Sequence, residues 1–314
     1  MKNIYSNIYS FNNKTLKKTV DNLSNGNLVS LPTETVYGLA GNAYSKKAVN
    51  KIYKLKKRPK NNPLIVHYHN INQTNKDVIL NKFFLKYYKK YCPGPITFIL
   101  RKKKGSKINS LVTANLKTVA IRFPKHRVIR TILKKIKFPI AMPSANVSSK
   151  LSPVTAYDVR SEFKKKLKII VNGGKCKIGI ESTVIDLTGK PRILRPGIIS
   201  FNDLNSTISK NIKSRPVIKS PGMLGKHYYP GIPVILNQKP SNSQYAFITF
   251  GKKYKSRKNH FNLSKQGNLN EAASNLYATM RNIKNKGFKK IFVTKIPNRG
   301  AGIAINDRLK RASK

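Results

Sequence analysis

The stretch NLVSLPTETVYGLA, residues 27–40, passes directly from an apolar run into a cluster of hydroxyl groups around one carboxylate. The apolar part is typical of a buried strand that ends at Pro32. Loops that follow strands often carry chemistry, so we expect the polar cluster to lie at the mouth of a site. Glu34 is notable because the chain has 10 acidic residues against 64 lysines and arginines. Strand alternation would point Glu34 away from Thr33 and Thr35, and we therefore expect it to form a structural ion pair.

Outside this stretch, short apolar strands alternate with amphipathic segments. Residues 45–58 are predicted to form a helix with Ser45 as its N-cap, and residues 155–163 a helix capped by Thr155. A third helix is predicted over residues 77–91. Further strands are predicted over residues 63–69, 92–100, 118–124, 138–146, 167–174 and 182–188, and the last is expected to pair with residues 192–197. Several of these strands follow one another without an intervening helix, which predicts an α/β fold with a mixed sheet.

The composition changes near Asn211. Residues 211–233 are rich in proline and glycine, which is typical of a linker. This segment separates a predicted first domain, residues 1–210, from a second unit over residues 234–314. Strand, helix, strand and helix are predicted there in turn, over residues 245–250, 270–288, 290–297 and 305–313. This order predicts a small α/β domain.

The formal net charge of +54 has two interpretations. A strongly basic protein is suited to binding nucleic acid. The lysines are spread along the whole chain, however, and lysine, asparagine and isoleucine are all encoded by codons made of A and T alone. A biased genome would give this composition to any protein. Weak, nonspecific RNA binding would follow in either case.

Composition also narrows the class of protein. A chain of 314 residues is long enough for one large or two ordinary domains with a full core. The sequence has no run of 18 apolar residues, so no membrane span is predicted. The first residues lack the apolar segment of a signal peptide. Cys92 and Cys176 are isolated and have no zinc-binding spacing. We expect a cytoplasmic protein.

Several common sites are excluded by the sequence. It contains neither the glycine-rich loop G-x-x-x-x-G-K-[ST] nor G-x-G-x-x-G after a strand, so any nucleotide would bind outside these phosphate loops. The scarcity of carboxylates argues against a hydrolase that uses two acids. His67 and His69 alternate along one predicted strand, but two ligands do not make a metal site.

Three groups of polar residues are candidates for a site. Arg58 precedes Pro59 at the exit of a basic helix, with Lys56 nearby. This pair could clamp a phosphate or carboxylate, or could simply complement the helix dipole. Arg122 lies inside an apolar strand and needs an anionic partner, either from the protein or from a ligand. The hydroxyl and amide groups of residues 142–153 suit a ligand, although ordinary turns use the same residue types.

Taken in order, the motifs PTETVYG, K-x-RP followed by N-x-PL, PGP-x-T, AIR-x-P, PSAN, STV-x-D and LRPG resemble those of the threonylcarbamoyl-AMP synthase family. The resemblance covers roughly residues 15–200. The later motifs SPG-x(4)-HYYP and GAGIAINDRLKRAS are similar to the longer, two-domain branch, although the second domain looks short for that branch. The resemblance implies an α/β (α+β) fold: a YrdC-like twisted mixed sheet with flanking helices, plus a small C-terminal Rossmann-like α/β domain.

The resemblance also implies an activity. The enzyme would be a nucleotidyltransferase, an L-threonylcarbamoyladenylate synthase, which forms threonylcarbamoyl-AMP and pyrophosphate from L-threonine, bicarbonate or CO₂, and ATP. A downstream transferase would then modify the adenosine next to the anticodon of tRNA. Mg²⁺ is expected to ride on the ATP phosphates with few protein ligands, and no tightly bound cofactor is expected. A basic pocket would lower the repulsion among three anionic substrates.

Roles for individual residues follow from the matching motifs. L-threonine is expected to contact Thr35, Tyr37, His67, Arg122 and Ser182, with Arg122 taking its carboxylate. ATP is expected to contact Lys56, Arg58, Asn62, Thr118, Ser144, Asn146, Ser152, Arg195 and Tyr229. Lys56 and Arg58 are also the expected catalytic residues.

The linker is expected to act as a lid, because a plain spacer has little use for the histidine and two tyrosines of SPGMLGKHYYP. Tyr229 would then cover the nucleotide, although these side chains could instead simply pack the linker onto a domain surface. Two other functions remain open. One is a non-catalytic protein that binds double-stranded RNA with the same fold. The other is a transferase that uses carbamoyl phosphate, a class that normally carries zinc fingers, for which this chain has no CxxC pairs.

Overall fold

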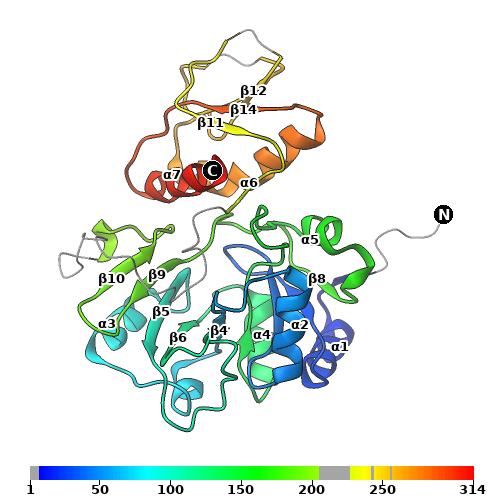
Figure 1. The fold of residues 1–314 in the computed structure, drawn as a ribbon, viewed down its shortest axis with the longest axis vertical. Helices are drawn as coiled ribbons and strands as arrows, with labels where there is room; N and C mark the ends of the chain where they lie inside the picture. The colour runs from blue at the N-terminus through cyan, green and yellow to red at the C-terminus, as the bar shows by residue number, and fades with distance from the viewer. Residues whose placement is uncertain (1–6, 205–226, 242–243, 255–256) are drawn as a thin grey trace.

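The computed structural model describes residues 7–204, 227–241, 244–254 and 257–314. Figure 1 shows a large unit formed by the N-terminal part of the chain and a smaller unit formed by the C-terminal part. Helices α6 (Leu269–Asn285) and α7 (Ala301–Ala312) belong to the small unit and lie between its strands and the large unit. The two units therefore face each other through these helices.

The large unit is built on one sheet of ten strands in the order β1-β8-β2-β3-β7-β4-β6-β5-β9-β10. The strands are β1 (Ile8–Ser10), β2 (Val29–Leu31), β3 (Gly38–Asn42), β4 (Ile65–His67), β5 (Ile96–Arg101), β6 (Thr118–Arg122), β7 (Ile140–Ala141), β8 (Ile170–Asn172), β9 (Thr183–Asp186) and β10 (Arg192–Arg195). Strands β4 and β6 pair in parallel, whereas β5 and β6, and β9 and β10, are antiparallel. The predicted mixed sheet is confirmed.

Helices flank this sheet, and capping residues mark where they begin. They are α1 (Asn13–Ser24), α2 (Lys46–Lys56), α3 (Lys82–Tyr91), α4 (Arg127–Lys135) and α5 (Ala156–Phe163), with short 3₁₀ turns η1 (Ile71–Thr74), η2 (Lys164–Lys166) and η3 (Asn202–Leu204). The predicted N-caps are confirmed, since the Ser45 hydroxyl accepts from the Ala48 N–H and the Thr155 hydroxyl from the Asp158 N–H. Helices α1 and α4 pack together on the sheet, as Figure 1 shows, through a buried cluster that includes Leu23 and Ile129.

The structure corrects some predicted elements. Helix α3 begins at Lys82 rather than at residue 77, because Asn81 caps it and the Asp77 carboxylate is held by the Tyr68 hydroxyl at 2.9 Å. Helices α1 and α4, and strands β1, β3, β11 and β13, are missing from the sequence prediction. Helix α1 has few apolar residues, and strands β1, β11 and β13 have three residues each, so their local signals are weak. Tertiary packing decides such segments more than their own propensity does. Helix α4 does carry an apolar face, formed by Val128, Ile129, Ile132 and Leu133, and the sequence prediction misses this signal.

The small unit is a parallel sheet of four strands in the order β11-β14-β12-β13. Its strands are β11 (Val234–Leu236), β12 (Ala246–Thr249), β13 (His260–Asn262) and β14 (Ile291–Val293). Helix α6 joins β13 to β14 and α7 follows β14. Parallel strands joined by a helical crossover are the arrangement expected of a Rossmann-like domain.

The predicted linker, residues 211–233, is only partly described. Residues 211–226 lie outside the described residues, and the described part begins at His227. The small sheet starts with β11 at Val234. Within the described ranges, none of the helices has the length and apolar character needed to span a membrane.

The cap of α5 leads to a prediction about stability. In a capping box, the Thr155 hydroxyl accepts from the Asp158 N–H while the Asp158 carboxylate accepts from the Thr155 N–H. Thr155→Ala should therefore lower the free energy of unfolding by about 1 kcal/mol in a denaturant titration. Ser161→Ala changes an exposed residue of the same helix and is the matched control. Equal losses in the two variants would contradict a specific role for the cap.

Candidate active site

The loop between β2 and β3, residues 32–37, forms one wall of the site. The Thr33 hydroxyl accepts from the N–H groups of Thr35 (3.1 Å) and Val36 (3.2 Å) and donates to the Val36 carbonyl oxygen (2.7 Å). This is a local turn stabilised by a threonine side chain, and it fixes Thr33 beside the cavity. The extended geometry assumed in the sequence prediction is therefore wrong for this loop.

Glu34 nevertheless forms the ion pair that the sequence predicts. Its Oε1 accepts from Arg122 Nη2 at 2.6 Å, and its Oε2 accepts from the Lys125 N–H at 3.0 Å. Burial alone would raise the pKa of Glu34, but the adjacent Arg122 holds this pKa below its usual value. Arg122 Nε is buried and has no hydrogen-bond partner within the described part of the chain. The contact with Glu34 therefore leaves donors of Arg122 without a protein partner in the described part of the chain.

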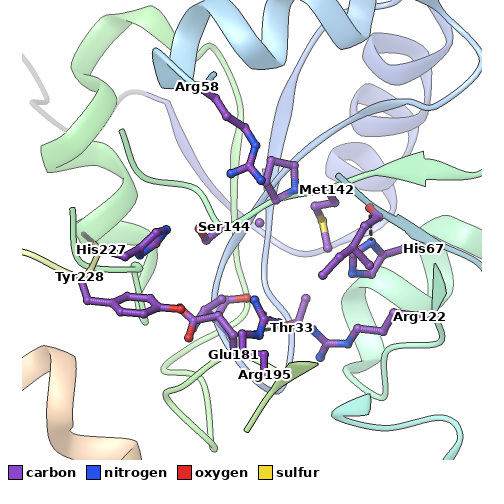
Figure 2. A pocket seen from close by; sticks show the side chains of 14 residues that line it. Thr33, Arg58, His67, Arg122, Met142, Ser144, Glu181, Arg195, His227 and Tyr228 are labelled. Carbon is purple, nitrogen blue, oxygen red and sulfur yellow. Dashed lines mark hydrogen bonds between the residues drawn. The ribbon is translucent and has the colours of Figure 1, made fainter. Parts of the chain in front are cut away.

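Side chains from several elements converge on one cavity, shown in Figure 2. His67 and Arg122 end the neighbouring strands β4 and β6 and lie opposite each other in their register. Arg58 follows α2, and Arg195 ends β10. The lining residues are Thr33, Val36, Gly38, Arg58, Ile65, His67, Arg122, Met142, Pro143, Ser144, Glu181, Arg195, His227 and Tyr228. Five of the expected site residues are therefore brought together: Arg58, His67, Arg122, Ser144 and Arg195.

The cavity carries buried positive charge. The arginines Arg58, Arg122 and Arg195 are 8%, 4% and 4% exposed. Burial lowers the pKa of Arg58 to about 10, so this group remains charged at neutral pH. Burial also lowers the pKa of His67 to about 3, so its ring is neutral there. Withdrawing a cation from water costs several kcal/mol unless an anion compensates it, which makes this cavity suited to anionic ligands.

Glu181 is the one carboxylate among the lining residues. Its oxygens accept from the hydroxyls of Ser152 (2.5 Å) and Tyr277 (3.1 Å) and from Arg308 Nε (2.9 Å). Burial would raise the pKa of Glu181, but the charges of Arg308 and Arg195 and these hydrogen bonds lower it to about 2. A carboxylate so strongly held in its ionised form is not suited to take a proton at neutral pH.

Most of the other expected site residues lie behind the cavity wall. These are Thr35, Tyr37, Lys56, Asn62, Asn146, Ser152 and Ser182, all of which are buried. Lys56 Nζ donates to the carbonyl oxygens of Ser144 (2.6 Å) and Asn146, and burial lowers the pKa of Lys56 well below its usual value. The Ser182 hydroxyl accepts from Arg195 Nη2 at 3.1 Å. In this arrangement these side chains position the residues that line the cavity.

Two expected site residues lie elsewhere. Thr118 begins β6 whereas Arg122 ends it, which separates the two by about 13 Å of strand. Tyr229 is 37% exposed and lines a groove outside the cavity, where its N–H donates to the Ser149 carbonyl oxygen at 2.8 Å. The adjacent ring of Tyr228 lines the cavity and is 1% exposed. The motif does not distinguish two adjacent tyrosines, and only the path of the chain decides which one faces inward.

Besides Thr33, which belongs to the predicted polar cluster, three polar lining residues have no substrate role in the sequence prediction. His227 and Tyr228 belong to the linker motif, which had suggested Tyr229 in their place. Glu181 directly precedes a predicted site residue, Ser182. A carboxylate is not expected in a site for anions, and the sequence does not reveal that Arg308 pairs with it. His227 could have been singled out because histidine is rare in this chain, which has 5.

Two family models match the chain. The model described as telomere recombination matches residues 21–197, and the model described as the C-terminal domain of threonylcarbamoyl-AMP synthase matches residues 199–314. Among curated proteins, the threonylcarbamoyl-AMP synthase of Pyrococcus abyssi is 34% identical, over 92% of this chain and 91% of the relative. The threonylcarbamoyl-AMP synthase of Bacillus subtilis is 32% identical, over 97% of this chain and 94% of the relative.

The fold agrees with a solved structure over both units. The crystal structure of P. abyssi Sua5 complexed with L-threonine matches with a TM-score of 0.85 and 30% identity, over 98% of this chain and 96% of that one. The family models, the curated relatives and this structure all extend across the large and the small unit. The chain belongs to the threonylcarbamoyl-AMP synthase family.

Proposed function

We propose that this protein forms threonylcarbamoyl-AMP and pyrophosphate from L-threonine, bicarbonate or CO₂, and ATP. The observation that carries the proposal is the convergence of three buried guanidinium groups, from Arg58, Arg122 and Arg195, on one cavity. Each of the three substrates brings negative charge, and preorganised cations lower their mutual repulsion. Family membership and the L-threonine complex of P. abyssi Sua5 support the same activity.

The chemistry needs positioning more than proton transfer. The amino nitrogen of threonine attacks the carbon of CO₂ and loses a proton, which gives a carbamate. A carbamate oxygen then attacks the α-phosphorus of ATP, and the bond from that phosphorus to the bridging oxygen breaks, so pyrophosphate leaves. Arg122 would hold the threonine carboxylate through its unpaired Nε. Arg58 and Arg195 would stabilise the phosphates, by charge-assisted hydrogen bonds.

Mg²⁺ enters this proposal as part of the MgATP substrate. The described residues contain no group of three or more histidine, cysteine, aspartate or glutamate side chains that could hold a metal. At the cavity, Glu181 is occupied by Ser152, Tyr277 and Arg308, and Glu34 is paired with Arg122. The phosphates and water would therefore supply most of the ligands, as is common for Mg²⁺.

The decisive experiment is an assay of pyrophosphate release. Release from ATP that requires both L-threonine and bicarbonate is expected, and the adduct should be recoverable by chromatography. Pyrophosphate release without those requirements, or no release at all, would contradict the proposal. The same preparation tests the next step, because a threonylcarbamoyl transferase supplied with the product should modify tRNA only when this protein is active. A protein that only binds double-stranded RNA would show neither activity.

Arg58 is the first residue to test. Its guanidinium lines the cavity and also donates to the carbonyl oxygens of Asn62 (2.9 Å) and Pro63 (2.8 Å). Losing a charge-assisted contact to the phosphates should reduce adduct formation at least about tenfold in Arg58→Ala. Lys60→Ala removes a charge from an exposed neighbouring position and should leave the rate nearly unchanged. Normal activity in folded Arg58→Ala, with a wild-type melting temperature, would remove Arg58 from the site.

The choice of amino acid gives a second prediction. The polar side chains of His67 and Ser144 line the cavity, so it offers hydrogen-bonding groups to a substrate hydroxyl. A site that hydrogen-bonds a substrate hydroxyl rejects an isostere that lacks it, so we expect kcat/KM for valine to be at least about 100-fold below that for threonine. Serine, which keeps the hydroxyl, should be used better than valine. Equal turnover of threonine and valine would contradict hydroxyl recognition.

The lid hypothesis is now best tested at Tyr228. This ring lines the cavity, whereas Tyr229 points into an outer groove, and the pair therefore forms a natural comparison. If the segment shields a carbamate and a mixed anhydride from water, Tyr228→Ala should raise ATP consumption per adduct recovered severalfold, and Tyr229→Ala should change it much less. A wild-type ratio in Tyr228→Ala would contradict the lid. A larger effect in Tyr229→Ala would restore the original prediction for that residue.

A further inference from the structure

One buried cluster joins the small unit to the cavity. Glu181 lines the cavity and belongs to the large unit, whereas its partners Tyr277 and Arg308 come from α6 and α7 of the small unit. Arg308 and Tyr277 are at most 1% exposed, so this contact is shielded from water. The cluster spans 127 positions of sequence between Glu181 and Arg308. It is a tertiary contact between units that ends at the wall of the site.

Arg308 makes three contacts through one guanidinium group, and one of them is an ion pair from Nη1 to the neighbouring Asp307 at 2.7 Å. Its edge donates from Nε to Glu181 at 2.9 Å, and its carbon Cζ lies 5.3 Å from the centre of the Tyr228 ring. Such an arrangement combines a charge-assisted hydrogen bond with a cation–π contact. Tyr228 also stacks on Tyr277, with ring centres 5.6 Å apart. The small unit therefore holds both Glu181 and Tyr228, which line the cavity next to each other (Figure 2).

Tyr228 needs such support because of its backbone. Its φ is +65°, in the left-handed region that a bulky residue with a Cβ seldom adopts. A residue persists there only when its surroundings fix it. The two units also approach closely nearby: a Cβ added at Gly179 would lie 2.6 Å from the Ser274 backbone in α6. This close packing leaves little freedom for α6 to move relative to the cavity wall.

We propose that Arg308 is a positioning residue through which the C-terminal domain shapes the nucleotide side of the active site. Its guanidinium fixes Glu181 by its edge and Tyr228 by its face. Glu181 directly precedes Ser182, whose carbonyl oxygen and hydroxyl each accept from Arg195 at 3.1 Å. A movement of Glu181 would therefore also move Ser182 and, through it, the guanidinium group of Arg195. The C-terminal domain is then a working part of the site.

The same geometry predicts which substrate is affected. Figure 2 shows His67 and Arg122 on the side of the cavity opposite His227 and Tyr228. In the described part of the chain, the side-chain partner of Arg122 is Glu34, which lies in the loop after β2 of the large unit. This inference rests on the proposed function, which identifies the substrates as ATP and L-threonine. On that basis, loss of the Arg308 contacts should weaken ATP binding and leave L-threonine binding nearly unchanged.

The test uses the full-length protein and binding measurements in place of turnover. Arg308→Lys keeps the charge but loses the planar fork, and we expect its Kd for a non-hydrolysable ATP analogue to rise at least about tenfold, with less than a twofold change for L-threonine. Tyr277→Phe is a milder second variant, because it removes the hydroxyl that donates to Glu181 and keeps the ring stacked on Tyr228. Lys310→Ala, at an exposed position of α7, is the control and should bind both ligands as the wild type does.

A double-mutant cycle separates positioning from simple stability. If Arg308 acts through Glu181, the effects of Arg308→Lys and Glu181→Gln on analogue binding should be strongly non-additive. A purely structural contact would lower the melting temperature of the folded variants while leaving their Kd values unchanged, and that outcome would overturn the proposal. Equal weakening of ATP and L-threonine binding would also overturn it.

Hydrogen exchange provides a readout that does not depend on the substrates. The amides of Thr183 and Tyr229 donate to Pro95 and Ser149 oxygens in the structure, and both should exchange faster in Arg308→Lys but not in Lys310→Ala. If the wild type fails to bind the ATP analogue, the proposed function is contradicted, and exchange alone then decides whether Arg308 positions the wall. Unchanged exchange at both amides would overturn the positioning role.

Discussion

The burial of three arginine side chains around one cavity is the constraint on which the rest of this structure depends. Arg58, Arg122 and Arg195 are withdrawn from water, so each needs support from its surroundings. Glu34 pairs with Arg122, carbonyl oxygens accept from Arg58, and the carbonyl oxygen and hydroxyl of Ser182 accept from Arg195. Three cations and one lining carboxylate, Glu181, leave an excess of positive charge around the cavity, which favours anionic ligands.

The mixed sheet is what makes such a cavity possible. Parallel β4 and β6 end side by side at His67 and Arg122, while the antiparallel return of β10 on β9 brings Arg195 to the same place. Glycine contributes where the walls approach: a Cβ at Gly38 would lie 2.4 Å from Met142 Cγ. The site is therefore assembled from strand ends and loops on a rigid frame, which is where function usually lies in α/β proteins.

A second constraint lies at the contact between the two units. An isolated carboxylate beside three buried cations would oppose anion binding, yet Glu181 lines this cavity. Arg308 resolves the conflict, because it supplies a compensating charge from outside the site and keeps Glu181 ionised with a pKa of about 2. Both members are buried, so breaking this pair would remove a large part of the charge compensation of Glu181. The two-domain architecture thus has a physical consequence within the site itself.

The sequence by itself determined the family, the mixed α/β class and the residue types of the site, because ordered motifs and helix caps are local patterns. Ser45 and Thr155 cap helices through contacts three residues away, and such contacts can be recognised without a fold. Only the tertiary structure decided which side chains face the cavity. It placed Tyr228 inside and Tyr229 outside, put Lys56 behind the wall, and left Thr118 at the far end of its strand. It also joined Arg308 to Glu181 across 127 positions. Such contacts depend on how the chain returns to itself, and no local pattern of residues encodes that path.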